Sequence, residues 1–160
     1  MDLLKKTDSN ESKIYTEDKT LQEMFLKNTG RLNRLRYFKR SLVMILVTFV
    51  IDFILITIFS DEWGIPTSFG NLATSVVGIV ALVPMYCLNV RRLQDLNKDD
   101  TIAKIILAVC FGALFIPDED YYSLSTLVII VCLVETIIVL YLLFAPGTKG
   151  ENKYGPDPLG

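Results

Sequence analysis

Two carboxylic acids, Asp52 and Glu135, are the residues of this chain whose type and position best suit chemistry. Each lies near the middle of a long apolar stretch, with no Lys or Arg at the same depth to pair with it. A charged carboxyl group at the centre of a bilayer costs roughly 2.5–3.5 kcal/mol, so such groups usually face the interior of a helix bundle. Desolvation and a like-charge neighbour both favour the neutral form. The pair is therefore a candidate intramembrane proton or cation site.

A structural role is the alternative for the same two residues. A neutral carboxyl can hydrogen-bond to a backbone carbonyl or to a hydroxyl group on a neighbouring helix, the candidates here being Thr48, Ser75 and Thr136. The two apolar stretches run antiparallel and have similar lengths, so Asp52 and Glu135 lie at similar depth. The sequence leaves open whether they are in contact.

Signatures of enzymes are absent from the chain. It contains no nucleotide-binding glycine loop, no GxSxG and no HExxH. It has no His, so Ser–His and Cys–His pairs are excluded. The three cysteines lie inside apolar stretches without metal-ligand spacing, and the isoelectric point near 5.1 argues against nucleic acid. We expect a non-enzymatic protein without cofactor, metal or disulfide.

Four apolar stretches must position these residues, at 41–60, 69–90, 102–117 and 124–145. A helix needs roughly 20 apolar residues to cross a bilayer, and the first and fourth stretches show no polar face of the kind that soluble helices carry. The third is short and spans only if Lys104 snorkels to the interface or the helix continues past Pro117. The pattern predicts an all-α integral membrane protein with four transmembrane helices in one domain over residues 20–160.

Basic residues lie on one side of these stretches. Lys and Arg precede the first stretch, occupy the segment 91–100 between the second and third, and follow the fourth. The two other loops carry only acids among their charged residues. The positive-inside rule therefore places both termini and the segment 91–100 in the cytoplasm.

The residues before the first stretch form two parts. Residues 1–19 are polar, and we expect a disordered cytoplasmic arm. Thr20 and Glu23 fit a capping box for a short amphipathic helix that ends near Gly30. This helix lies on the membrane surface or packs on another cytoplasmic segment, and the short pattern does not decide between them.

Three motifs occur in order along the chain: GRLNRLRYFKRSL at Gly30–Leu42, RRLQD at Arg91–Asp95 with Pro84 before it, and PGTKGENKYGPDP at Pro146–Pro158. Together they resemble the bacterial inner-membrane family called domain of unknown function 805. The resemblance implies a small polytopic inner (plasma) membrane protein with no established activity. Gln94 stands where the family has His, so the resemblance implies no histidine chemistry for this chain.

All three motifs fall on the predicted cytoplasmic side. The tail is rich in turn residues, so we expect it to dock on the first two motifs; the alternative is a set of basic lipid anchors with a loose tail. Either Arg91 or Arg92 has the spacing to pair with Asp95, and Tyr37 suits the membrane–water interface. The candidate motif cluster comprises Arg31, Arg34, Tyr37, Arg91, Arg92, Asp95, Tyr154, Gly155 and Pro156.

These observations predict a membrane module that binds lipid or a protein partner through its cytoplasmic face. The expected partners are the bilayer, anionic lipid headgroups, and a second copy of the chain or another membrane protein. The alternative function is a small transporter or channel component that uses Asp52 and Glu135.

Overall fold

All regular secondary-structure elements in the part of the chain that the structure, a computed structural model, describes are helices; that part comprises residues 18–61, 64, 66–113 and 125–159. The helices are α1 (Leu21–Phe25), α2 (Arg34–Phe59), α3 (Ser68–Asp95), α4 (Thr101–Ala113) and α6 (Ser125–Phe144). The prediction of an all-helical protein is confirmed.

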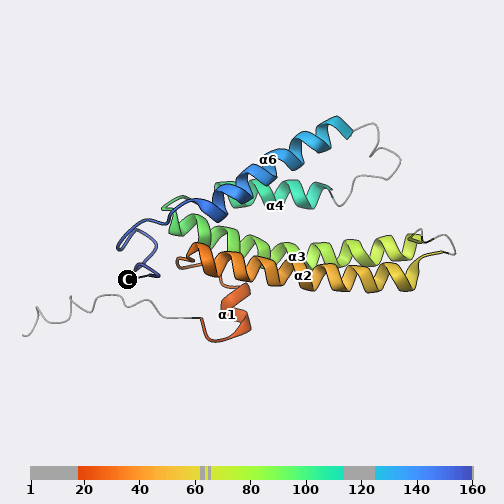
Figure 1. The fold of residues 1–160 in the computed structure, drawn as a ribbon, viewed down its shortest axis with the longest axis horizontal. Helices are drawn as coiled ribbons and strands as arrows, with labels where there is room; N and C mark the ends of the chain where they lie inside the picture. The colour runs from red at the N-terminus through yellow and green to blue at the C-terminus, as the bar shows by residue number, and fades with distance from the viewer. Residues whose placement is uncertain (1–17, 62–63, 65, 114–124, 160) are drawn as a thin grey trace, which may run out of the picture.

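Helices α2 and α3 form a long antiparallel hairpin (Figure 1). Their apolar windows have mean hydropathies of 2.9 and 1.8. At 1.5 Å per residue their 26 and 28 residues extend about 39 and 42 Å, more than the roughly 30 Å of a hydrocarbon core. The apolar window of α2 is not buried at all, whereas a core helix of a soluble protein would bury it. Both helices are therefore long enough, and α2 is apolar enough on its outside, to cross a membrane.

Helices α4 and α6 are shorter, with 13 and 20 residues. In Figure 1 both lie on one side of the hairpin, and α6 slopes away from it toward the end remote from the C-terminus. The predicted stretch 102–117 corresponds to α4, but its last four residues lie outside the described part. The structure thus shows two long and two shorter apolar helices, and α4 as described would extend only about 20 Å.

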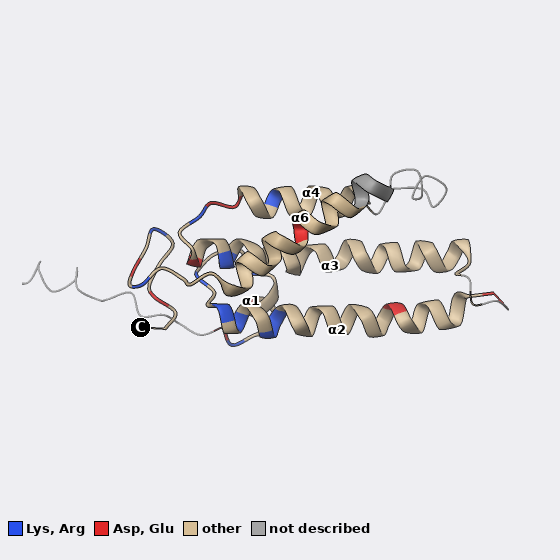
Figure 2. Cartoon of the chain, turned by 45° about the horizontal axis from the view of Figure 1, so that its top comes forward, with Lys and Arg blue, Asp and Glu red and all other residues tan. Residues whose placement is uncertain are grey.

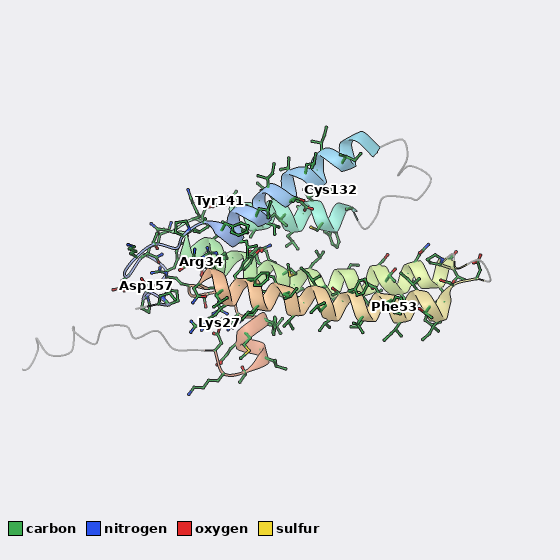
Figure 3. The ribbon with its side chains drawn as sticks, in the orientation of Figure 1. Lys27, Arg34, Phe53, Cys132, Tyr141 and Asp157 are labelled. Atoms are coloured by element: carbon green, nitrogen blue, oxygen red, sulfur yellow. The ribbon has the colours of Figure 1, made fainter. Side chains whose placement is uncertain are left out.

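Buried side chains gather at one end of the molecule. The hydrophobic core comprises Leu32, Tyr37, Leu88, Val90, Leu93, Leu96, Ala103 and Leu142. Lys and Arg gather at the same end, beside the C-terminus, as Figure 2 shows; we call it the basic end. Elsewhere apolar side chains point outward, as Phe53 does in Figure 3. Such an exposed apolar exterior matches lipid rather than water.

The segment before α2 differs in part from its prediction. Residues 1–17 of the predicted disordered arm lie outside the described residues, but Asp18 is buried. The capping box is confirmed, because the Thr20 hydroxyl accepts from the Glu23 amide and the Glu23 carboxylate accepts from the Thr20 amide. Helix α1 ends at its cap Leu26, before Gly30, so the predicted stop at Gly30 is wrong. Phe25 packs on the core, and α1 therefore lies against the bundle.

Candidate functional site

Asp95 is the point at which the first two motifs meet. Nε of Arg31 donates to its Oδ1 at 3.1 Å, and Nη1 of Arg92 donates to its Oδ2. All three side chains are at least 97% buried, with exposed fractions of 1%, 0% and 3% for Arg31, Arg92 and Asp95. Of the two arginines with suitable spacing, Arg92 rather than Arg91 pairs with Asp95. We call Arg31, Arg92 and Asp95 the Asp95 network.

Arg92 also fastens the end of α6. Its Nε donates to the carbonyl of Leu142 at 2.6 Å, and its Nη2 donates to that of Ala145. The last carbonyls of a helix lack partners within the helix and carry partial negative charge. A guanidinium group placed there satisfies both needs, so Arg92 joins α6 to the end of α3.

Arg31 fastens the tail. Its guanidinium donates to the carbonyls of Thr148 and Gly150, and at 3.4 Å to that of Gly155. Thr148 in turn donates through its amide (2.9 Å) and its hydroxyl (3.0 Å) to the backbone carbonyl of Asp95. Asn152 donates to the carbonyl of Gln94 at 3.0 Å. The tail therefore lies against the C-terminal end of α3.

Two glycines of the tail have geometric reasons for their identity. A Cβ atom at Gly147 would overlap the Asp95 carboxylate. Gly155 has φ 133°, a conformation that favours glycine, and exchanges backbone hydrogen bonds with Asn152 at 3.0 and 3.1 Å. Tyr154 and Pro156 are half-buried, and Nζ of Lys153 lies 4.8 Å from the Tyr154 ring centre. The turn residues thus shape a tail that fits closely over Asp95.

Arg91 belongs to a second buried cluster. Arg91 and Arg40 each donate to Oδ2 of Asp18 at 2.7 Å, and they also donate to the carbonyls of Glu23 and Met24. Burial alone would raise the pKa of Asp18, but the hydrogen bonds and charges of Arg91 and Arg40 outweigh it and hold that pKa below its ordinary value. This cluster ties α1, and Asp18 three residues before it, to α2 and α3.

Tyr37 and Arg34 are placed differently from each other. Tyr37 is buried and its hydroxyl donates to Asn89 at 2.9 Å, so the hydroxyl does not reach water as its predicted place at the membrane–water interface implied. Its ring packs into the core and its hydroxyl finds a partner on α3 instead of water. Arg34 is exposed, and within the described residues it makes no hydrogen bond or ion pair. It lines a cavity together with Asp157 of the tail, and it takes no part in the hydrogen bonds of the network.

Within the described residues, no hydrogen bond joins the carboxyls of Asp52 and Glu135. Oε1 of Glu135 accepts from the Cys110 thiol at 3.1 Å and lines a cavity of about 180 Å³ between α3, α4 and α6. Oδ1 of Asp52, on α2, is buried without a hydrogen-bond partner among the described residues. The hydroxyls proposed as structural partners all donate to carbonyls of their own helices; they belong to Thr48, Ser75 and Thr136. Glu135 therefore has a partner that the sequence did not indicate.

Several residues of the site were not found by sequence reasoning. Asn33 had a recognisable signal, since Asn is a preferred N-cap and its side chain accepts from the Arg36 amide at 2.9 Å. Asp18, Asn89 and Thr148 had none, because each has at least one partner more than fifty residues away in the chain.

The apolar helices expose their side chains along most of their length, and buried arginines gather at one end of the molecule. These features define a small helical membrane protein. The chain belongs to the family described as protein of unknown function (DUF805), whose profile matches residues 25–156. It is 28% identical over 130 residues to inner membrane protein YhaH of Escherichia coli strain K12, which covers 81% of this chain and 84% of YhaH; YhaH of strain O157:H7 gives the same values. No solved structure matches the chain. The resemblance seen in the three motifs is confirmed, and the protein is an inner membrane protein of a family without an established function.

Proposed function

We propose that this protein is a non-enzymatic membrane module with four spans, both termini in the cytoplasm, and a folded cytoplasmic cap that binds lipid or a protein partner. The cap consists of residues 18–33, Arg91–Asp100 and residues 146–159. Its location follows from the positive-inside rule, since the basic end holds all three of these segments.

The Asp95 network is the observation that carries this proposal. Removing charged groups from water is expensive, and their mutual attraction offsets that cost only when the hydrogen-bonding geometry is good. Here two fully buried guanidinium groups fasten the tail, the end of α6 and the end of α3 together. A tail that served only as a loose end would not need this arrangement. A preformed surface binds with less loss of conformational freedom, which supports a role in recognition.

Photo-crosslinking in cells tests the proposal. A photoreactive residue in place of Tyr154, which is half-buried at the cap surface, is expected to give discrete adducts with lipid or with one protein. The same group at Phe53, exposed in the middle of α2, serves as the control for general membrane contact. If the two positions give identical adducts, the cap is not a recognition surface.

A transporter or channel component is the second candidate, favoured by the cavity beside Glu135. That cavity also touches Tyr86, Asn89 and Cys110, so polar groups line part of it. Proton or cation flux through proteoliposomes should fall in Glu135→Gln and in Asp52→Asn if the carboxyls carry it. Unchanged flux in both variants would remove this candidate.

A further inference from the structure

Two cations at the basic end, Arg34 and Lys149, face one cavity and have no counter-ion among the described residues. Arg34 begins α2 and Lys149 lies in the tail, and both side chains are exposed. Within the described part of the chain neither makes a hydrogen bond or an ion pair, in contrast to the buried arginines beside them. Both line the same cavity, of about 400 Å³, between the start of α2 and the tail. Two positive groups therefore face a shared space that is large enough for a phosphate group.

A second cavity of about 410 Å³ adjoins the first. Arg34 and Leu35 line both cavities, and the second is otherwise bounded by Phe38, Leu143 and Phe144. It lies between the N-terminal end of α2 and the C-terminal end of α6. We call the two cavities together the Arg34 groove, which is cationic at its tail end and apolar toward the helices.

Two carboxylates also line the groove, and their charge is already compensated. Asp95 is held by Arg31 and Arg92. Asp157 accepts from the amides of Gly150 (2.8 Å) and Leu159 (3.0 Å), and its Oδ1 lies 4.0 Å from Nη2 of Arg31. Hydrogen bonds from these amides hold the pKa of Asp157 below its ordinary value, so it stays ionised and occupied. Arg34 and Lys149 have no such partner within the described part of the chain, so both can receive an anion.

The apolar part of the groove continues along the outside of the bundle. Leu35, Phe38 and Leu42 are exposed and follow one another at helical spacing on α2, and Phe144 is exposed on α6. In an inner membrane protein, lipid chains cover such a face. A protein partner would need a polar rim with its own partners, whereas the groove offers one cationic end and one apolar face.

We propose that the Arg34 groove binds one anionic glycerophospholipid, with its phosphate between Arg34 and Lys149 and an acyl chain along Leu35 and Phe38. This inference rests on the proposed function, because it needs the basic end to lie at the headgroup level. It specifies the ligand class of the cap and the residues that select it.

The test measures binding of phosphatidylglycerol and phosphatidylcholine to the purified full chain in detergent, by native mass spectrometry. A basic residue near an anionic surface contributes about 1 kcal/mol, so Arg34→Gln and Lys149→Gln should each weaken phosphatidylglycerol binding about fivefold, and the double variant about thirtyfold. Lys39→Gln is the matched control: it removes an exposed charge from α2 but lines neither cavity, and binding should change less than about twofold if the groove is the site. Thermal unfolding without added lipid checks that each variant is folded, which is expected since neither the Arg34 nor the Lys149 side chain makes a hydrogen bond or an ion pair within the described residues.

Each outcome of this experiment either supports the proposed lipid site or overturns it. Selective loss in the groove variants, with phosphatidylcholine binding unchanged and short-chain phosphatidylglycerol binding more weakly, supports the proposal. Equal loss in Lys39→Gln, competition by inorganic phosphate at equal strength, or a dimer that replaces the lipid overturns it. If the wild-type chain and the groove variants bind phosphatidylglycerol equally well, the groove is not the lipid site, although the proposed function of the cap stands. If the photoreactive residue at Tyr154 captures neither lipid nor protein, the proposed function itself is disproved.

Discussion

At the scale of residues, the unusual feature is how much charge the basic end removes from water. Arg31, Arg91 and Arg92 are the largest fully buried side chains, and they face the buried carboxylates of Asp18 and Asp95. Buried ion pairs stabilise little by themselves, but removing one member leaves a buried charge without compensation. The arginines also bind carbonyls from segments far apart in sequence. The main structural effect of these arginines is to determine which segments of the chain pack against one another.

Asp95→Asn should therefore destabilise the protein by about 3–5 kcal/mol, the usual cost of breaking a buried ion pair from one side. Arg31 and Arg92 would lose the carboxylate between them, and the tail should loosen first. Thermal unfolding measures the loss of stability, and hydrogen exchange of amides 148–158 measures the loosening. Asp100→Asn is the control, because its ion pair with Lys104 is exposed and its loss should leave both readouts unchanged. Wild-type exchange rates in the Asp95→Asn tail would show that the network does not hold it.

Asp18 makes a pH-dependent contribution with a definite sign. Its pKa is lowered in the folded protein, so the folded state favours the ionised form. Its contribution to stability is complete above the ordinary carboxyl pKa of about 4 and is lost as pH falls through the lowered value. The wild-type chain should thus be more stable than Asp18→Asn at neutral pH, and the difference should shrink as pH falls below about 4. Unfolding curves of both proteins over this range provide the measurement, and a difference that grows with acidity would contradict the assignment.

At the scale of elements, hydropathy predicted the helices well but their ends poorly. The long stretches at 41–60 and 69–90 became α2 and α3, yet both helices extend further toward the basic end. An apolar stretch ends at the first charged residues, whereas the helix itself continues for as long as tertiary contacts and caps such as Asn33 support it. Depth alone also failed to predict partners for Asp52 and Glu135, because equal depth says nothing about which helix faces which. The partner of the Tyr37 hydroxyl was missed for the same reason, because only the packing of α3 brings Asn89 beside it.

The contact between α4 and α6 can be tested by crosslinking. Cys110 and Glu135 are in hydrogen-bonding contact, so Glu135→Cys should form a crosslink with Cys110 through a short thiol-reactive reagent, in a background that carries both Cys87→Ala and Cys132→Ala. Asp52→Cys in the same background should not, since Asp52 lies on α2 and has no hydrogen bond to α4 or α6. Gel mobility after crosslinking and proteolysis between the two helices distinguishes the products. A crosslink to Cys110 from position 52 and not from position 135 would show that α2 rather than α6 lies against α4 at this depth. That result would favour the transporter candidate.

At the scale of the whole molecule, packing and charge are concentrated at one end, and the rest is an apolar surface. The core residues, the arginines and the docked tail all lie at the basic end, while α6 leaves the hairpin toward the opposite end. The charge pattern alone predicted that the three motifs lie at the same end of the molecule. The buried contacts that join them did not, because Asp18 occurs in a polar segment like any other and its two arginine partners are distant in sequence. The contacts within the cap could therefore not be predicted from local sequence, because they form only when segments distant in the chain are brought together by the fold.

The number of spans is the property of the whole molecule on which the cap's location depends. Helices α2 and α3 are each long enough to cross a bilayer, but the described part of α4 extends only about 20 Å, so a two-span protein with α4 and α6 entering from one side is a distinct arrangement. Reporter fusions separate the two. Four spans place fusions after Glu62 and after Ser123 outside the cytoplasm, and fusions after Lys98 and at the C-terminus inside. A two-span arrangement keeps the fusion after Glu62 outside but moves the one after Ser123 inside. Since the positive-inside rule constrains the basic end in both arrangements, the cap stays cytoplasmic either way, and only a cytoplasmic reporter after Glu62 would place it on the other face.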